Sequence, residues 1–89
     1  MSFMLLAFTK SYAEGRVKPE TFSEAYIELY RLERDYDLLL KDNNKLSECL
    51  SSIFCIADLY NPNLDKEEYE LNDEELLIQV NAELEKLNS

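Results

Sequence analysis

The chain has 89 residues but only one glycine and two prolines. An all-β domain needs a turn signal about every 8–12 residues, and glycine and proline supply most of those signals. Leucine, glutamate, lysine and alanine, which favour helices, are plentiful. Apolar residues make up 46% of the chain, so a folded domain explains the composition better than disorder does. The sequence therefore predicts an all-α protein, with one domain over residues 1–89.

Apolar residues recur at helical spacing in four segments of the chain. The four helices are expected at about Ser2–Glu14, Pro19–Asp35, Lys45–Leu59 and from Asn72 onwards. Residues 36–44 include three consecutive leucines and could either extend the second helix or cross the core as a loop. Short links between neighbouring helices favour antiparallel packing, so we expect an antiparallel four-helix bundle.

Residues at the ends of these segments support the boundaries. Gly15 suits the left-handed position that often follows a helix C-terminus. Pro19 suits the first turn of a helix, where its missing N–H would be unpaired in any case. Asn72 stands three residues before Glu75, which is the spacing of a capping box. Pro62, with an asparagine on each side, ends the third segment.

The same spacing predicts which side chains face the core. The expected inward residues are Phe3, Leu6, Ala7 and Tyr12, widened by Met4, Leu5 and Phe8; then Phe22, Tyr26, Leu29 and Tyr30; then Leu46, Leu50, Ile53, Phe54 and Ala57; then Leu76, Leu77, Val80, Leu84 and Leu87. Cys49 and Cys55 are about 9 Å apart along a helix axis, which is too far for a disulfide. We therefore expect two reduced thiols, with Cys55 filling the core.

The negative charge is concentrated in one part of the chain. The net charge is −10, and residues 58–75 carry eight acidic residues against the single base Lys66, a net −7. Two interpretations remain open: a solvated loop whose acids complement the N-terminus of the last helix, or a docking surface for a basic site. Tyr60 and Tyr69 lie among the acids and favour the docking surface, since tyrosine adds contact area at low entropic cost.

The composition also excludes several functions. A strongly acidic surface repels phosphates, which argues against direct binding of nucleic acid or of an anionic membrane, and it suits a basic protein partner. The chain has no histidine, no CxxC, no glycine-rich phosphate loop and no EF-hand spacing. We therefore expect no catalytic residue, metal, cofactor or small-molecule substrate. The absence of a signal peptide and of an apolar run of about 20 residues predicts a cytoplasmic protein.

Several segments, taken in order, resemble one protein family. The matching pieces are KPETFSE (Lys18–Glu24), IFCIAD (Ile53–Asp58) with Tyr60 and Pro62, YELND (Tyr69–Asp73) and the pattern over Val80–Lys86. Through them the chain is similar to the colicin D immunity protein family, which includes the immunity proteins of klebicins and of contact-dependent inhibition systems. The resemblance covers about the whole chain in order and length.

The resemblance implies a cytosolic, cofactor-free four-helix inhibitor from a bacterium. Its partner would be the C-terminal tRNase domain of a cognate toxin, whose positive site it fills with acidic side chains that mimic RNA phosphates. Asp58, Asp65, Glu70 and Asp73 match acidic positions of the family. Asn61 and Asn63 stand where the colicin D inhibitor has acids that face its toxin. Two explanations stay open: the cognate toxin is a related but different nuclease, or Glu67 and Glu68 take the place of those acids.

The expected toxin-binding residues combine this resemblance with the charge pattern. They are Asp58, Tyr60, Asn61, Asn63, Asp65, Glu67, Glu68, Tyr69, Glu70 and Asp73. An acidic helical adaptor or regulatory protein, with a basic partner and no toxin, remains the alternative hypothesis.

Overall fold

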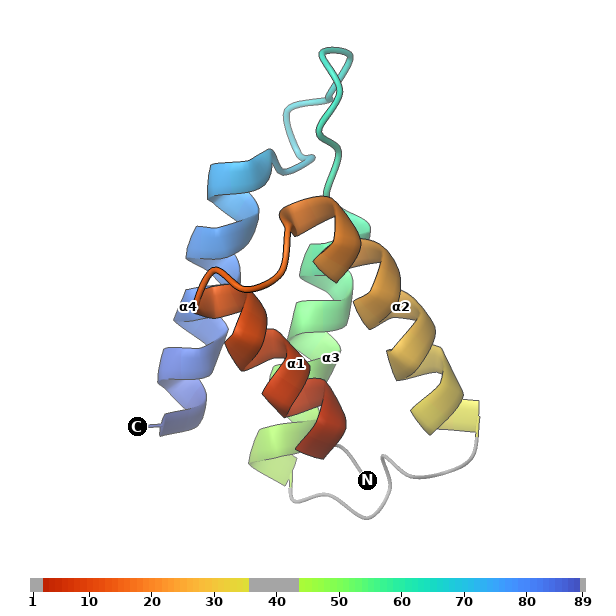
Figure 1. Ribbon diagram of the computed structural model, residues 1–89, viewed down its shortest axis with the longest axis vertical. Coiled ribbons are helices and arrows are strands. Elements are labelled where there is room, and N and C mark those ends of the chain that lie inside the picture. The colour runs from red at the N-terminus through yellow and green to blue at the C-terminus, as the bar shows by residue number, and fades with distance from the viewer. Residues whose placement is uncertain (1–2, 36–43, 89) are drawn as a thin grey trace.

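A computed structural model describes residues 3–35 and 44–88 of the chain. These residues form four helices, α1 (Phe3–Ala13), α2 (Pro19–Asp35), α3 (Asn44–Asp58) and α4 (Asp73–Asn88). Successive helices run in opposite directions (Figure 1). Contacts join α1 to α2, α2 to α3, α3 to α4 and α4 back to α1. The prediction of an all-α antiparallel four-helix bundle is confirmed.

The helix ends follow the local signals in the sequence. Gly15 has a φ of +85°, the left-handed conformation expected after α1. At the start of α4, the Glu75 N–H donates to Asn72 Oδ1 at 2.9 Å and the Asn72 N–H donates to Glu75 Oε1 at 3.0 Å. This reciprocal pair is the predicted capping box. Asn44 begins α3, and the open question about residues 36–43 lies outside the described part of the chain.

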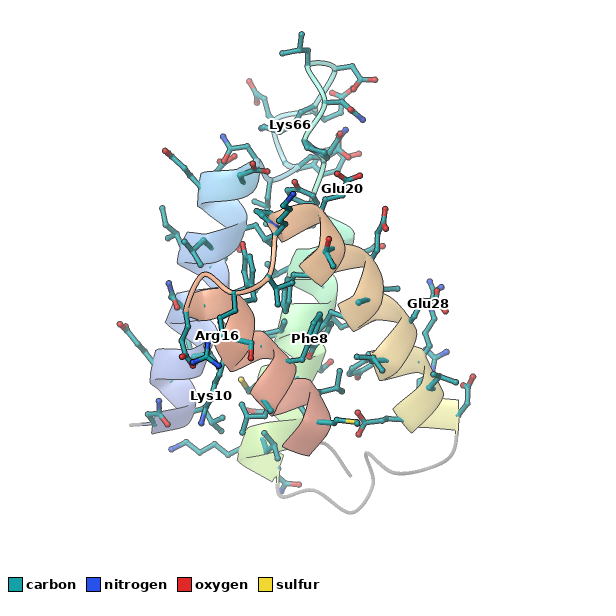
Figure 2. The ribbon with its side chains drawn as sticks, in the orientation of Figure 1. Phe8, Lys10, Arg16, Glu20, Glu28 and Lys66 are labelled. Carbon is teal, nitrogen blue, oxygen red and sulfur yellow. The ribbon has the colours of Figure 1, made fainter. Side chains whose placement is uncertain are left out.

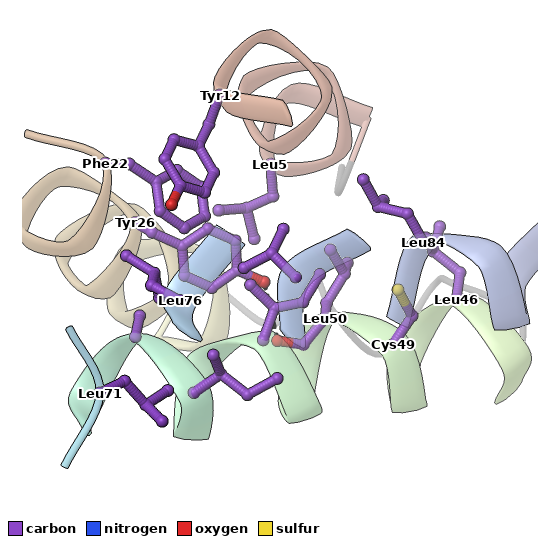
Figure 3. Packing of buried hydrophobic residues seen from close by; sticks show 14 residues of the cluster. Leu5, Tyr12, Phe22, Tyr26, Leu46, Cys49, Leu50, Leu71, Leu76 and Leu84 are labelled. Atoms are coloured by element: carbon purple, nitrogen blue, oxygen red, sulfur yellow. Dashed lines mark hydrogen bonds between the residues drawn. The ribbon is translucent and has the colours of Figure 1, made fainter. Parts of the chain in front are cut away.

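Aromatic side chains of α1 and α2 lie together in the core of the bundle (Figure 3). Phe22 is fully buried and stacks on Tyr12, with ring centroids 4.2 Å apart. The row continues through Tyr26 and Tyr30 to Phe54 of α3. These aromatic residues were predicted to pack in the core, and the prediction is confirmed.

Two predicted details of the core are wrong on α1 and α4. The inward face of α1 is Leu5, Thr9 and Tyr12, whereas Ala7 and Met4 are exposed. Residues four and then three apart share one helix face, and Thr9 can join that face because its hydroxyl donates to the Leu5 carbonyl oxygen at 2.8 Å. A search for apolar residues passes over such an internally satisfied threonine. On α4, Leu77 lies at the exposed margin of the core and not within it.

The prediction that Cys55 fills the core is wrong. Cys49 is buried and Cys55 is exposed, both as free thiols. Cys49 lies three residues after Leu46 and four before Ile53, so it belongs to the inward face of α3. Cys55 is only two residues from Ile53 and therefore lies on the other side of the helix. The Cys49 thiol donates to the Glu83 carbonyl oxygen of α4 at 3.6 Å.

Two buried tyrosine hydroxyls provide a matched test of this core. The Tyr26 hydroxyl donates to the Leu50 carbonyl oxygen at 2.7 Å. The buried Tyr12 hydroxyl has no hydrogen-bond partner among the residues that the structure describes, and burial, with Asp73 nearby, raises the pKa of Tyr12 to about 12. We expect Tyr26→Phe to lower the free energy of unfolding by about 1 kcal/mol and Tyr12→Phe to raise it by about 1 kcal/mol. Urea unfolding followed by circular dichroism measures both, and a loss in Tyr12→Phe equal to that in Tyr26→Phe would contradict this description of the Tyr12 hydroxyl.

Candidate functional site

The acidic part of the chain forms a loop that projects beyond one end of the bundle (Figure 1). We call residues 59–72, which join α3 to α4, the α3–α4 loop. Asp58 ends α3 just before the loop, and Asp73 begins α4 just after it. The structure therefore places all ten predicted site residues on this loop or at its two ends.

Backbone hydrogen bonds join the two ends of the loop. The Leu71 N–H donates to the Leu59 carbonyl oxygen at 2.8 Å, and the Asn61 N–H donates to the Leu71 carbonyl oxygen at 2.9 Å. Tyr60 and Leu71 form an isolated β-bridge through these contacts. The Leu71 side chain is buried in the core, so the base of the loop is fixed to the bundle.

Glu70 ties the middle of the loop together. Its Oε1 accepts a hydrogen bond from the Glu67 N–H at 2.9 Å and another from Asn61 Nδ2 at 3.2 Å. These bonds, chiefly the one from Glu67, lower the pKa of Glu70. Asn61 Oδ1 in turn accepts from the Asn63 N–H at 3.0 Å. Asn61 and Glu70 therefore act first as structural residues of the loop.

Lys66 is the one basic residue between positions 58 and 75, and its ammonium group turns back into the loop (Figure 2). Lys66 Nζ donates to the Glu70 carbonyl oxygen at 2.9 Å and to the Glu67 carbonyl oxygen at 3.3 Å. It also lies 3.7 Å from Glu75 Oε1. The ammonium group of Lys66 therefore bonds within the loop and does not neutralise the exposed carboxylates around it.

Tyr60 and Asp73 are bonded to each other across the base of the loop. The Tyr60 hydroxyl donates to Asp73 Oδ1 at 2.6 Å. Burial and this hydrogen bond raise the pKa of Tyr60 above its ordinary value. Tyr60 is half-buried, so it contributes to the structure of the loop base more than to its outer surface.

The remaining acids point into solvent. The side chains of Asp58, Asp65, Glu67 and Glu68 are exposed and make no hydrogen bond or ion pair with any residue in the described ranges. Asn63 and Tyr69 are exposed as well. The ten predicted residues thus divide into an outward group (Asp58, Asn63, Asp65, Glu67, Glu68 and Tyr69) and a loop-building group (Tyr60, Asn61, Glu70 and Asp73).

The fold adds two acids that the sequence reasoning missed. A shallow polar groove of about 290 Å³ lies between the first turns of α2 and the loop, lined by Glu20, Ser23, Glu24, Tyr60, Asn61, Pro62 and Asn63. Glu20 and Glu24 are exposed and extend the negative surface beside the loop. Figure 2 shows Glu20 near the base of the loop. Glu20 and Glu24 lie about 40 residues before the loop in the sequence, so a count of charges along the chain did not group them with the loop. The KPETFSE segment, which contains both glutamates, was the only feature of the sequence that indicated a role for them.

Comparison with known families places the chain in one of them. A model of bacterial self-protective colicin-like immunity proteins matches residues 1–87. The chain belongs to this family. As an immunity protein, it protects the cell that makes it by binding a cognate toxin, and members of the family are inhibitors and not enzymes. No curated protein matches the chain.

The helices of this immunity protein are short and carry many charges. Within residues 3–35 and 44–88, none is long and apolar enough to cross a lipid bilayer.

Proposed function

We propose that this immunity protein inhibits the C-terminal nuclease domain of its cognate toxin, a tRNase carried by a bacteriocin or a contact-dependent inhibition system. The α3–α4 loop enters the basic active site and occupies the positions of RNA phosphates. Binding takes place in the bacterial cytoplasm and needs no cofactor. The protein blocks the site by occupying it and carries out no chemistry of its own.

One observation carries the proposal: exposed carboxylates that no described residue neutralises stand on a projecting loop whose only base is turned inward. A site that binds RNA must offer positive charge to phosphates. Opposite charges on an inhibitor speed encounter, up to about 10⁹ M⁻¹s⁻¹ at low salt. Rapid capture matters because a free nuclease cleaves many RNA molecules.

The internal bonding of the loop supports the same function. The bonds made by Glu70, Asn61 and Lys66 hold the loop in one conformation before any partner arrives. A preorganised loop loses less conformational entropy on binding, which leaves more of the interaction energy for affinity.

The test combines growth and inhibition in one experiment. Co-expression of the chain with the toxin encoded next to its gene should restore growth. The purified chain should inhibit tRNA cleavage by the isolated toxin domain in competition with tRNA, and its association rate should fall steeply as salt is added. An adaptor without a toxin partner would give neither rescue nor inhibition. Binding that left tRNA cleavage unaffected would contradict occlusion of the active site.

A further inference from the structure

Leu64 is the most exposed apolar residue in the described part of the chain. Its relative exposure is 107%, so it retains no more shielding than it would have in an unfolded peptide. Other exposed apolar residues, such as Met4 and Ile78, lie on helices and keep part of their surface covered. An apolar side chain so fully exposed to water contributes no burial to the stability of the fold.

The loop holds Leu64 in a defined place. The Lys66 N–H donates to the Asn63 carbonyl oxygen at 3.3 Å, which closes a turn with Leu64 and Asp65 at its two central positions. Such positions usually carry glycine, proline, asparagine, aspartate or serine. The Asn63 N–H is fixed by Asn61, and Lys66 Nζ is fixed by the Glu70 carbonyl oxygen, so both ends of the turn are anchored.

We propose that Leu64 is the apolar anchor of the toxin interface and enters an apolar pocket of nucleobase size within the basic site of the toxin. The inference rests on the proposed function and goes beyond phosphate mimicry. A site that binds single-stranded RNA pairs cationic groups for the phosphates with apolar or aromatic surfaces for the bases. The loop carries the matching pattern, with Leu64 next to Asp65 and close in sequence to Glu67 and Glu68.

Interface energetics favour this role for Leu64. The residues that dominate binding are apolar or aromatic groups that become fully buried in a pocket of the partner, with polar groups around them. Tyr69, which is 68% exposed, offers a second apolar surface on the same loop, its aromatic ring. The outward acids steer the encounter, and Leu64 then slows dissociation.

Leu64→Asp separates this role from a purely electrostatic one, because only an apolar anchor predicts that the substitution weakens binding to the toxin. If the loop acted by charge alone, one more acid would leave binding unchanged or strengthen it. If Leu64 enters an apolar pocket, Leu64→Asp should weaken binding to the toxin domain by about 100-fold and Leu64→Ala by about 10-fold, from the loss of a buried leucine side chain. The loss should appear as faster dissociation, while association stays as fast as in the wild-type chain.

The control is Ile78→Asp, which makes a similar change at an exposed position of α4 and should leave binding unchanged. Surface plasmon resonance with the isolated toxin domain gives both rate constants, and thermal unfolding should show that all three variants fold, because both sites face solvent. Equal or tighter binding by Leu64→Asp would overturn the inference while the inhibition by the wild-type chain still stands. A wild-type chain that fails to inhibit the toxin would overturn the proposed function itself.

Discussion

Replacing Asp58, Asp65, Glu67 and Glu68 together by their amides should abolish protection against the cognate toxin while leaving the bundle folded. All four carboxylates are exposed and unbonded to the residues that the structure describes, so their loss removes charge and no internal contact. If each contributes about 1 kcal/mol across the interface, the dissociation constant rises by about 1,000-fold. Most of the change in kinetics should be slower association and a weaker dependence on salt.

A matched control changes the same amount of charge elsewhere. Glu14, Glu28, Asp35 and Glu48 are exposed and lie outside the α3–α4 loop. Three of them belong to surface ion pairs, which contribute only about 0–1 kcal/mol each to stability. The single variant in which all four are replaced by their amides should protect cells as the wild-type chain does. Equal loss of protection in both quadruple variants would show that only the overall charge matters, and full protection in both would refute the acidic loop as the inhibitory surface.

Glu70 and Asp73 are left out of that variant for a structural reason. Glu70 holds Glu67 and Asn61, and Asp73 holds the Tyr60 hydroxyl. Removing either carboxylate would disturb the loop itself, so lost protection would not distinguish a binding role from a structural one. The four outward acids avoid this ambiguity.

Replacing Phe22 by alanine should lower the free energy of unfolding by about 3–5 kcal/mol. Phe22 is fully buried and lies at the centre of the aromatic row. The centroid of its ring is 4.2 Å from the ring centroid of Tyr12, 5.4 Å from that of Tyr26 and 5.5 Å from that of Phe8. Alanine would leave a cavity between α1 and α2. The two helices could fill it only by shifting toward each other. A small domain has only about 5–15 kcal/mol of stability in total, so this variant should be marginal at 37 °C.

Leu32 supplies the control on the same helix. It is apolar and 52% exposed, so Leu32→Ala should change the unfolding free energy by less than about 1 kcal/mol. Urea denaturation of both variants gives the comparison directly. A loss in Phe22→Ala no greater than that in Leu32→Ala would contradict the central place of the aromatic row.

The parts of the fold that follow from local chemistry were visible in the sequence. The 3.6-residue rhythm of apolar side chains predicted four helices, and the capping box of Asn72 and Glu75 formed as its spacing required. Thr9 was missed because hydrophobicity alone does not reveal a polar side chain that is satisfied within its own helix. The error over the cysteines was avoidable, because the spacing of Cys49 from Leu46 and Ile53 already placed Cys49 on the inward face.

The concentration of negative charge after α3 was determined by the sequence alone, because it is a property of consecutive residues. The tertiary structure decided which of those acids are available to a partner. Glu67 and Glu70 carry the same side chain, yet Glu70 is held by Asn61 nine residues away while the Glu67 carboxylate faces solvent. The same folding of the loop turns Lys66 inward and Leu64 outward. Hydrogen bonds among the residues of the folded loop, such as the one between Asn61 and Glu70, set these roles, and a list of consecutive residues does not show which of these bonds form.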